Sequence, residues 1–324
     1  MHAIRIFVAI LLSLSASLPL AALAQSVFPS KPLKFIVPFP AGSGIDATAR
    51  FIGLKISQQT GQPVVVENIP GANGFIAAQG VARAAPDGYT VFVTAATTQV
   101  LNPLLFNKLP YDPAKDFAAV SRISIQPMLL VVRATNTQIK TVQDLTALSK
   151  KTPGKLAFAS GNATSRIAGE LFNQLTGADM LHVPYKGIPQ GMTDLLGGQV
   201  DVMFPDMATG VAQIKSGSLR ALAVTGANRA ASLPDVPTMA EVGLAGFDLF
   251  TWTAAYVPAT TPKPVIDRIN ELFRVALTSA DAGKFFGGAG NTASPSTPAE
   301  LDAFTKAELE KWGRIVRTAN IPRE

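Results

Sequence analysis

The sequence predicts an α/β protein built from two lobes, and three observations lead to this prediction. Short β-branched runs alternate with helical patterns, turn-forming residues separate them, and about 300 residues remain after a predicted leader. Strands that alternate with helices favour a parallel sheet with helices on its faces. A single hydrophobic core usually stops growing near this length, so two units are expected.

The leader is predicted from the first 24 residues. Positions 1–5 are short and positively charged, positions 6–20 are apolar, and Ala22-Leu23-Ala24 places small residues where signal peptidase cleaves. This pattern is typical of a secretory signal peptide. A membrane anchor is the alternative, but the apolar run is shorter than the roughly 20 residues of a spanning helix. A lipoprotein anchor is excluded because the chain has no cysteine. We therefore expect a periplasmic protein that begins at Gln25.

The first lobe follows from a βαβαβ pattern. Apolar residues at Ala49, Ile52 and Ile56 keep helical spacing, and Gly61 is placed to end that helix. The turn at 86–88, Pro-Asp-Gly, closes the second helix. The predicted strands are 33–37, 64–67 and 89–94, and the predicted helices are 45–60 and 74–85.

The same alternation continues in the second lobe, with strands predicted at 128–133, 156–159, 181–184, 200–204 and 221–225, and helices at 141–150, 165–175, 192–196 and 208–215. The C-terminal helices, 263–279 and 298–318, have no predicted strand among them and are expected to pack on the first lobe. Residues 283–298, rich in Gly, Ser, Thr and Pro, are interpreted as a loop. The predicted domain limits are 25–126 plus 249–324 for the first domain and 127–248 for the second.

The composition indicates a well-packed globule without a nucleic-acid surface. Hydrophobic residues make up 48% of the chain, charged residues 15%, and the formal net charge is +6. Basic residues are scattered and do not alternate with aromatic residues, which disfavours nucleic-acid binding. The modest positive charge favours the approach of anions.

The most informative local feature lies at 37–46, VPFPAGSGID, between a predicted strand and a helix. Small residues let the backbone approach a ligand, and the free N–H groups of a helix N-terminus suit an anion. Ser43 or Asp46 is placed to cap the helix. An ordinary tight turn is the alternative. The segment is neither a Rossmann fingerprint nor a Walker A loop.

Three further junctions have related chemistry. Residues 160–166, SGNATSR, crowd hydroxyls and an amide before a helix, and Arg166 can pair with a ligand carboxylate or face solvent. Residues 183–187, VPYKG, offer a phenol, an ammonium group and a glycine N–H, or form a plain loop. Asp206, after a strand, can bind an amino group of a ligand or hold its own loop.

The usual parts of a catalytic site are missing. His182 is the only histidine of the mature chain, and with no cysteine the sequence excludes Cys-His nucleophiles and multi-histidine or thiolate metal sites. A Ser-His-Asp triad would require His182, which lies in a strand pattern and is interpreted as structural. We predict no catalytic residues, no cofactor and no metal, with an exported hydrolase or lyase as a remote alternative.

Motifs spread over nearly the whole mature chain resemble one family. They are PSKP at 29–32, VPFPAG at 37–42, VVVENIPGANG at 64–74, APDGY at 85–89, PYDP at 110–113, GELF at 169–172, VPYKG at 183–187, DLLGGQVD at 194–201, PDVPT at 234–238 and TPKP at 261–264. Each fragment is weak alone, but their order and number make the sequence similar to the extracytoplasmic receptors of tripartite tricarboxylate transporters, the Bug receptors.

The resemblance implies a type II periplasmic-binding-protein fold, in which two α/β domains close over a ligand in the cleft between them. It also implies that strand-to-helix loops hold the carboxylates of the ligand, and that the closed receptor docks transiently on membrane transporter subunits. Two positions depart from the common pattern. Ile45 replaces a hydroxyl residue, and Arg166 stands where many relatives carry histidine, which leaves the named ligand open.

We therefore expect a monomeric receptor for a small organic carboxylate that serves a transporter, or alternatively a sensor that signals to a kinase. The predicted ligand-binding residues are Phe39, Pro40, Ala41, Gly42, Ser43, Gly44, Asp46, Thr97, Ser160, Gly161, Asn162, Thr164, Ser165, Arg166, Tyr185, Lys186, Gly187 and Asp206.

Overall fold

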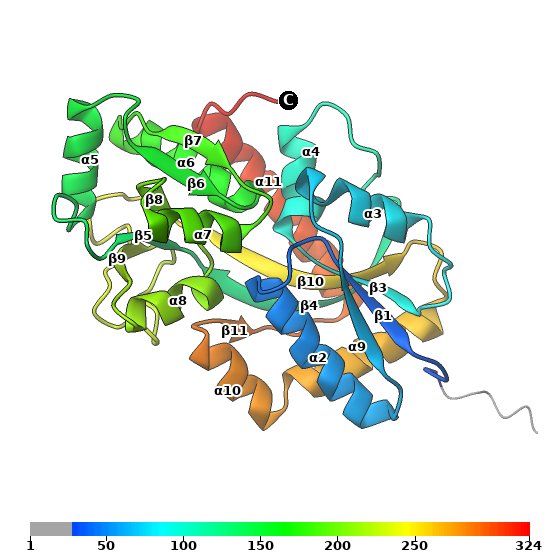
Figure 1. Cartoon of the computed structure of the whole chain (residues 1–324). Coiled ribbons are helices and arrows are strands. Elements are labelled where there is room, and N and C mark those ends of the chain that lie inside the picture. The colour runs from blue at the N-terminus through cyan, green and yellow to red at the C-terminus, as the bar shows by residue number, and fades with distance from the viewer. Residues whose placement is uncertain (1–27) are drawn as a thin grey trace, which may run out of the picture.

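Two β-sheets with helices on their faces form the molecule (Figure 1). This arrangement comes from a computed structural model that describes residues 28–324, so the predicted signal peptide, 1–24, lies outside the described residues. Within 28–324, no helix is long and apolar enough to cross a membrane. The predicted two-sheet α/β architecture is confirmed.

The first sheet has six strands in the order β11-β4-β10-β3-β1-β2. Strands β1, β2 and β3 run parallel, as the βαβαβ pattern predicts, whereas β10 and β4 run antiparallel to their neighbours. The strands are β1 (Leu33–Val37), β2 (Val64–Asn68), β3 (Thr90–Ala95), β4 (Phe117–Pro127), β10 (Phe250–Pro258) and β11 (Thr292–Ala293). Its helices are α2 (Gly44–Thr60), η1 (Ala72–Gly74), α3 (Phe75–Ala82), η2 (Thr97–Leu101), α4 (Asn102–Leu105), α9 (Lys263–Leu277), α10 (Ala280–Gly288) and α11 (Pro298–Thr318).

The second sheet has five strands in the order β7-β6-β8-β5-β9. The chain enters it directly after β4 and leaves it after β9, returning to the first sheet at β10. Its strands are β5 (Leu129–Arg133), β6 (Ala157–Ser160), β7 (Leu181–Pro184), β8 (Val202–Met203) and β9 (Leu219–Val224), and its helices are α5 (Val142–Lys151), α6 (Ala163–Thr176), α7 (Ile188–Gly197) and α8 (Met207–Lys215). The predicted domain limits remain a prediction.

Side-chain caps fix where the helices beside the cleft begin. The hydroxyl of Ser43 accepts a hydrogen bond from the backbone N–H of Asp46 and caps α2. Asn162 and Ser165 form a reciprocal capping box at the start of α6. Such caps satisfy N–H groups that a helix leaves unpaired, each stabilising by about 1 kcal/mol. The sequence thus sets the two helix ends that face the cleft.

Four elements, β4, β10, α10 and β11, differ from the sequence prediction. The expectation that no strand lies among the C-terminal helices is wrong, because β11 pairs with β4, and α10 occupies part of the predicted loop 283–298. Strands β4 and β10 were not predicted. Buried polar residues, such as Ser121, Ser124 and Thr253, interrupt their apolar runs. The backbone N–H and C=O groups of β4 and β10 are paired with neighbouring strands that are distant in the sequence, so the local sequence does not reveal these strands.

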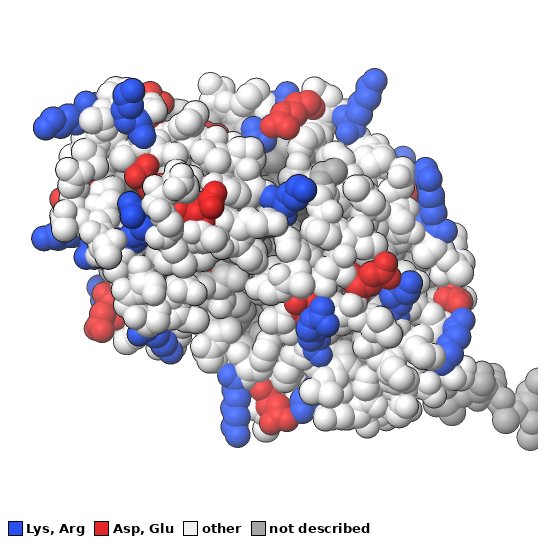
Figure 2. Space-filling view, viewed as in Figure 1, with Lys and Arg blue, Asp and Glu red and all other residues white. Residues whose placement is uncertain are grey.

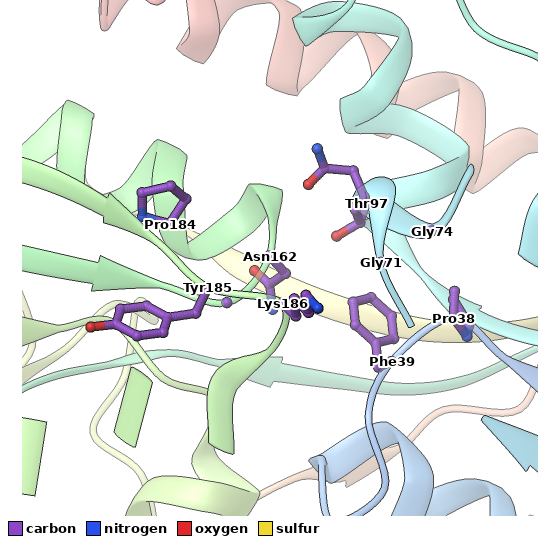
Figure 3. A pocket seen from close by; sticks show the side chains of 11 residues that line it. Pro38, Phe39, Gly71, Gly74, Thr97, Asn162, Pro184, Tyr185 and Lys186 are labelled. Atoms are coloured by element: carbon purple, nitrogen blue, oxygen red, sulfur yellow. The ribbon is translucent and has the colours of Figure 1, made fainter. Parts of the chain in front are cut away.

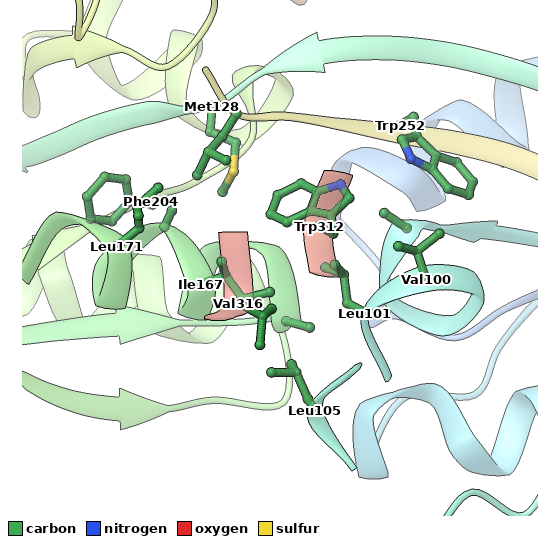
Figure 4. Close-up of a cluster of buried hydrophobic side chains, with 14 of the residues drawn as sticks. Val100, Leu101, Leu105, Met128, Ile167, Leu171, Phe204, Trp252, Trp312 and Val316 are labelled. Atoms are coloured by element: carbon green, nitrogen blue, oxygen red, sulfur yellow. The ribbon is translucent and has the colours of Figure 1, made fainter. Parts of the chain in front are cut away.

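One apolar cluster draws on both sheets (Figure 4). Leu101 from η2, Ile167 from α6 and Trp312 from α11 are all fully buried in it. Helix α11 packs against β4 and η2 and also against α6. The expectation that the C-terminal helices pack on the first lobe is therefore met, and α11 additionally joins that lobe to the second sheet.

Candidate functional site

A cavity of about 280 Å³ opens between the two sheets (Figure 3). The first-sheet side supplies the β1–α2 loop, η1 and the start of η2, and the second-sheet side supplies the β6–α6 and β7–α7 loops. The wall is formed by Pro38, Phe39, Gly71, Asn73, Gly74, Thr97, Gly161, Asn162, Pro184, Tyr185 and Lys186. Six of these eleven residues, Phe39, Thr97, Gly161, Asn162, Tyr185 and Lys186, belong to the predicted ligand-binding set.

A smaller cavity of about 40 Å³ adjoins the first, since Phe39 and Asn162 line both. The strands that connect the two sheets form part of its wall, and it includes the predicted residues Ser43, Gly44 and Asp206. The wall consists of Phe39, Ser43, Gly44, Ile45, Ala95, Gln126, Asn162, Ile188, Asp206, Thr251 and Thr253. The two cavities together bring the three loop junctions and Asp206, all four predicted sites, to one cleft.

Asp46 lines neither cavity, but its hydrogen bonds stabilise the first junction. Its carboxylate accepts hydrogen bonds from the N–H of Gly42 at 3.0 Å, from Nδ2 of Asn68 at 3.0 Å and from Arg50. Burial alone would raise the pKa of Asp46, but these hydrogen bonds, that from Arg50 foremost, lower it. Asp46 is thus ionised and holds the loop in shape.

At the second junction, the hydroxyl group of Ser165 serves the backbone of its own loop. Oγ of Ser165 accepts hydrogen bonds from the N–H groups of Gly161 at 3.0 Å and Asn162 at 3.2 Å. Thr164 is buried, and neither Ser165 nor Thr164 reaches a cavity wall. At this junction Gly161 and Asn162 line the cavity, and Asn162 also caps α6.

Arg166 does not reach the cleft. Its guanidinium group donates a hydrogen bond from Nη1 to Oε1 of Glu324, and Arg166 lines neither cavity. The geometry thus departs from the expected contact between Arg166 and a ligand carboxylate. The partner lies 158 positions away in the sequence, so no local pattern indicates the pairing.

The third junction supplies a cation. The phenol of Tyr185 donates a hydrogen bond to Asp194 at 2.7 Å, and this contact raises the pKa of Tyr185 to about 12. Lys186 is exposed and, among residues 28–324, forms no ion pair with a carboxylate. Figure 3 shows Lys186 and Asn162 facing Phe39 across the cavity. The ammonium group is therefore available to an anion.

Asp206 is buried in the wall of the smaller cavity and caps α8. Its Oδ1 accepts hydrogen bonds from the N–H and hydroxyl groups of Thr209, at 2.9 and 3.0 Å. Burial raises the pKa of Asp206 despite these bonds. The carboxyl group also faces the other lobe, since a Cβ atom added to Gly44 would lie 2.8 Å from Oδ1.

Several predicted residues lie at the edge of the cleft. Ala41 and Gly42 are exposed, and Pro40 packs against Gly187 across the cleft, where a Cβ added to Gly187 would lie 2.6 Å from the proline ring. None of these four residues lines either cavity.

Two buried polar atoms in the cavity walls lack a hydrogen-bond partner among the described residues. They are Oγ1 of Thr97 in the larger cavity and Oε1 of Gln126 in the smaller. An unpaired buried polar group costs about 1–3 kcal/mol, so a ligand or water molecule that bonded to these two atoms would be stabilised. Gln126, Thr251 and Thr253 were missed because their strands were not predicted. Asn73 lies within the quoted motif VVVENIPGANG and adopts a positive φ of 51°.

Ser160 and His182 form a hydrogen bond away from the cavities. Oγ of Ser160 lies 2.7 Å from Nε2 of His182, and neither residue lines a cavity wall. No carboxylate in the described part of the chain hydrogen-bonds to the imidazole. The pair therefore lacks the third member of a triad and the access that a nucleophile needs. Likewise, residues 28–324 contain no group of three His, Asp or Glu residues that could hold a metal.

Comparison with known proteins gives consistent matches. Residues 48–321 match the model of the tripartite tricarboxylate transporter family receptor. BugT of Bordetella pertussis is 34% identical over 92% of this chain and 92% of its own length. R. palustris Rpa4515 with adipate is 30% identical with a TM-score of 0.89, over 92% of this chain and all of that one.

Two further solved structures are similar over their full length. The periplasmic binding protein BugD is 31% identical with a TM-score of 0.87 and covers 92% of this chain. MatC of Rhodopseudomonas palustris with bound malate is 31% identical with a TM-score of 0.84 and covers 89% of this chain. In both cases all of the other chain is matched.

Proposed function

The chain belongs to the family of tripartite tricarboxylate transporter receptors, and we propose that it captures a small organic acid in the cleft between its two sheets. The family consists of solute receptors and includes periplasmic binding proteins. Two of its similar structures hold small carboxylic acids, adipate in one and malate in the other. These ligands define the chemical class that we expect here.

One observation carries the proposal, namely the ammonium group of Lys186 beside the N-terminus of α6, which forms no ion pair within residues 28–324. Gly161 and Asn162 bring that helix end to the same cavity wall as Lys186. A helix N-terminus and an ammonium group both favour a carboxylate. The hydroxyl of Thr97 on the opposite wall has no hydrogen-bond partner in the described part of the chain and can serve the ligand as a further one. An anion with additional oxygen atoms fits this arrangement.

The first test replaces the cation. We expect Lys186→Gln to weaken the binding of adipate or malate about tenfold, because a charge-assisted hydrogen bond contributes about 1.5–3 kcal/mol, partly screened at this exposed position. Isothermal titration calorimetry on the purified mature chain measures the dissociation constant. Lys215→Gln is the matched control, since Lys215 is an exposed lysine in the same lobe, at the end of α8.

A panel of solutes separates the proposal from other receptor classes. Thermal-shift screening compares organic acids with amines and neutral sugars. Stabilisation by acids that Lys186→Gln reduces and Lys215→Gln preserves supports the proposal. Stabilisation by amines or sugars alone, with no response to any acid, would refute it.

We further propose that the protein is exported by cleavage after Ala24, acts as a monomer and delivers its ligand to tripartite transporter subunits in the membrane. On this view, the protein has two domains, and the second, residues 127–248, closes against the first, residues 25–126 plus 249–324. Arg166 makes no contact with the ligand. The family match and the sequence of the leader support this proposal.

Mass spectrometry of the periplasmic fraction should find a chain that begins at Gln25. Ligand-dependent pull-down of membrane subunits tests delivery, and capture of a sensor kinase in its place would favour the signalling role.

A further inference from the structure

The segment after α11 bridges the two sides of the cleft. Its main chain is tied to the end of α4 and the residues after it, because the N–H of Glu324 donates to the carbonyl of Leu105 at 2.8 Å, and the N–H of Asn107 donates to the main-chain oxygen of Glu324 at 2.8 Å. Arg323 adds a hydrogen bond from Nε to the carbonyl of Leu104 at 3.2 Å. The segment is therefore held to the first-sheet side of the molecule.

The side chain of Glu324 contacts the other side. It accepts a hydrogen bond from the guanidinium group of Arg166, and Arg166 belongs to α6, which packs on β6 and β7 of the second sheet. Only 17% of the Arg166 side chain is exposed, against 52% for Glu324. Because the arginine is largely shielded from water, its attraction to the carboxylate is screened less than the attraction between two exposed groups.

The surroundings of Arg166 leave Glu324 as its hydrogen-bonded carboxylate. Glu170, on the next turn of α6, feels the charge of Arg166, but burial raises the pKa of Glu170 and disfavours its ionised form. His182, on β7, is also close enough for Arg166 and Glu324 to influence its pKa, which is lowered to about 4 by burial first and Arg166 second. The imidazole is therefore neutral near pH 7 and does not compete as a cation.

We propose that Arg166 and Glu324 form an interlobe latch that slows release of the ligand. Arg166 thus acts as a positioning residue through closure, without contact to the ligand. A contact that exists only in the closed form shifts the equilibrium between open and closed receptor, and the apparent affinity follows the closed fraction. This inference rests on the proposed ligand capture, but the contact itself can be tested without a ligand.

The first readout is the distance between lobes. The chain has no cysteine, so Gln58→Cys on α2 and Lys151→Cys on α5, both exposed, place one spin label on each lobe. Double electron–electron resonance then compares the latch variants with the parent, with and without adipate or malate. We expect Glu324→Gln and Arg166→Gln to shift the distribution toward longer distances.

The second readout is the dissociation rate. Stopped-flow measurement with adipate or malate should show release three- to tenfold faster in either variant, and the double variant should match the single ones because they remove the same contact. Glu271→Gln is the matched control, since it removes an ion pair with Arg274 that lies wholly within α9. It should change neither readout.

The outcomes separate the latch from the proposed function. Unchanged distances and unchanged release in both latch variants would overturn the latch, even if their melting temperatures fall. Additive effects of Arg166→Gln and Glu324→Gln would also overturn it, because independent contributions exclude a shared contact. A parent protein that binds neither acid contradicts the proposed function, while the distance distributions of the ligand-free variants still decide the latch.

Discussion

Two glycines beside the cleft exclude a side chain for different reasons. Gly161 lies against its own lobe, since an added Cβ would lie 2.2 Å from the backbone nitrogen of Ile188. Gly187 has an extended backbone, with φ of −176°, that any residue adopts, and its added Cβ would instead meet Pro40 on the opposite lobe at 2.6 Å. The first restriction concerns folding, and the second concerns closure.

We predict that Gly187→Ala weakens ligand binding at least tenfold and leaves the melting temperature of the ligand-free protein nearly unchanged. The new methyl group would meet the ring of Pro40 on the opposite lobe and would therefore oppose closure. Gly161→Ala should instead lower the melting temperature, because the clash lies within one lobe. Calorimetry and thermal unfolding of both variants check this contrast. Equal loss of stability in the two variants would contradict the closure role of Gly187.

At this scale the sequence indicated which junctions supply the cleft wall, but not which of their residues line it. Gly161, Asn162 and Lys186 line the cavity, as the strand-to-helix junctions indicated. Arg166 did not reach it, since its partner Glu324 comes from the far end of the chain. The local sequence shows which side chains a loop carries. Contacts with residues distant in the sequence, such as that of Arg166 with Glu324, determine which of these side chains remain free to bind a ligand.

Strands β6 and β7 show how pairing between elements sets the charge of a side chain. Residues Phe158 and His182 are neighbours across the parallel strands, and their rings stack with centroids 5.1 Å apart. Burial, followed by the positive charge of Arg166, lowers the pKa of His182 to about 4, while Glu324 opposes the shift. The imidazole therefore stays neutral in the folded protein where an exposed histidine would titrate.

We predict that His182 makes the protein less stable as the pH falls from about 6.5 toward 4. The unfolded chain takes up a proton near pH 6.5, whereas the folded protein does so only near pH 4, so the unfolded state binds more protons in this window. The melting temperature of the parent should fall across this range more steeply than that of His182→Gln. Buried carboxyls with raised pKa, such as Asp206, act in the opposite direction in both proteins and cancel in the comparison. Identical pH profiles would rule out a buried neutral imidazole.

The elements that sequence patterns missed share a physical cause. Strands β4 and β10 pair with each other in the middle of the first sheet, yet Ser121, Ser124 and Thr253 break their apolar patterns. Strand β11 has two residues and depends on the edge of β4. Periodicity detects elements that bury one apolar face, and it does not detect strands whose stability comes from neighbours distant in the chain.

For the whole molecule, alternation and turn residues were sufficient to predict two α/β units, because each local βαβ pattern leads to a parallel sheet. The crossing of the chain between sheets was harder to predict, as it depends on β4 running directly into β5. Basic and acidic side chains are interspersed on the face shown in Figure 2. The anion preference that we propose therefore rests on the local groups of the cleft and not on a broad charged surface.

The cluster around Trp312 has a consequence for how heat disrupts the protein. Val100, Ile167 and Val316 come from η2, α6 and α11, so separating the two sheets would expose apolar surface that belongs to both. We predict a single calorimetric transition whose van't Hoff and calorimetric enthalpies agree within about 10%. Trp312→Ala should split this transition in two and cost about 3–5 kcal/mol. Two resolved peaks in the parent protein would mean that the sheets melt independently. If one transition is observed, the indole of Trp312 links the melting of one sheet to that of the other.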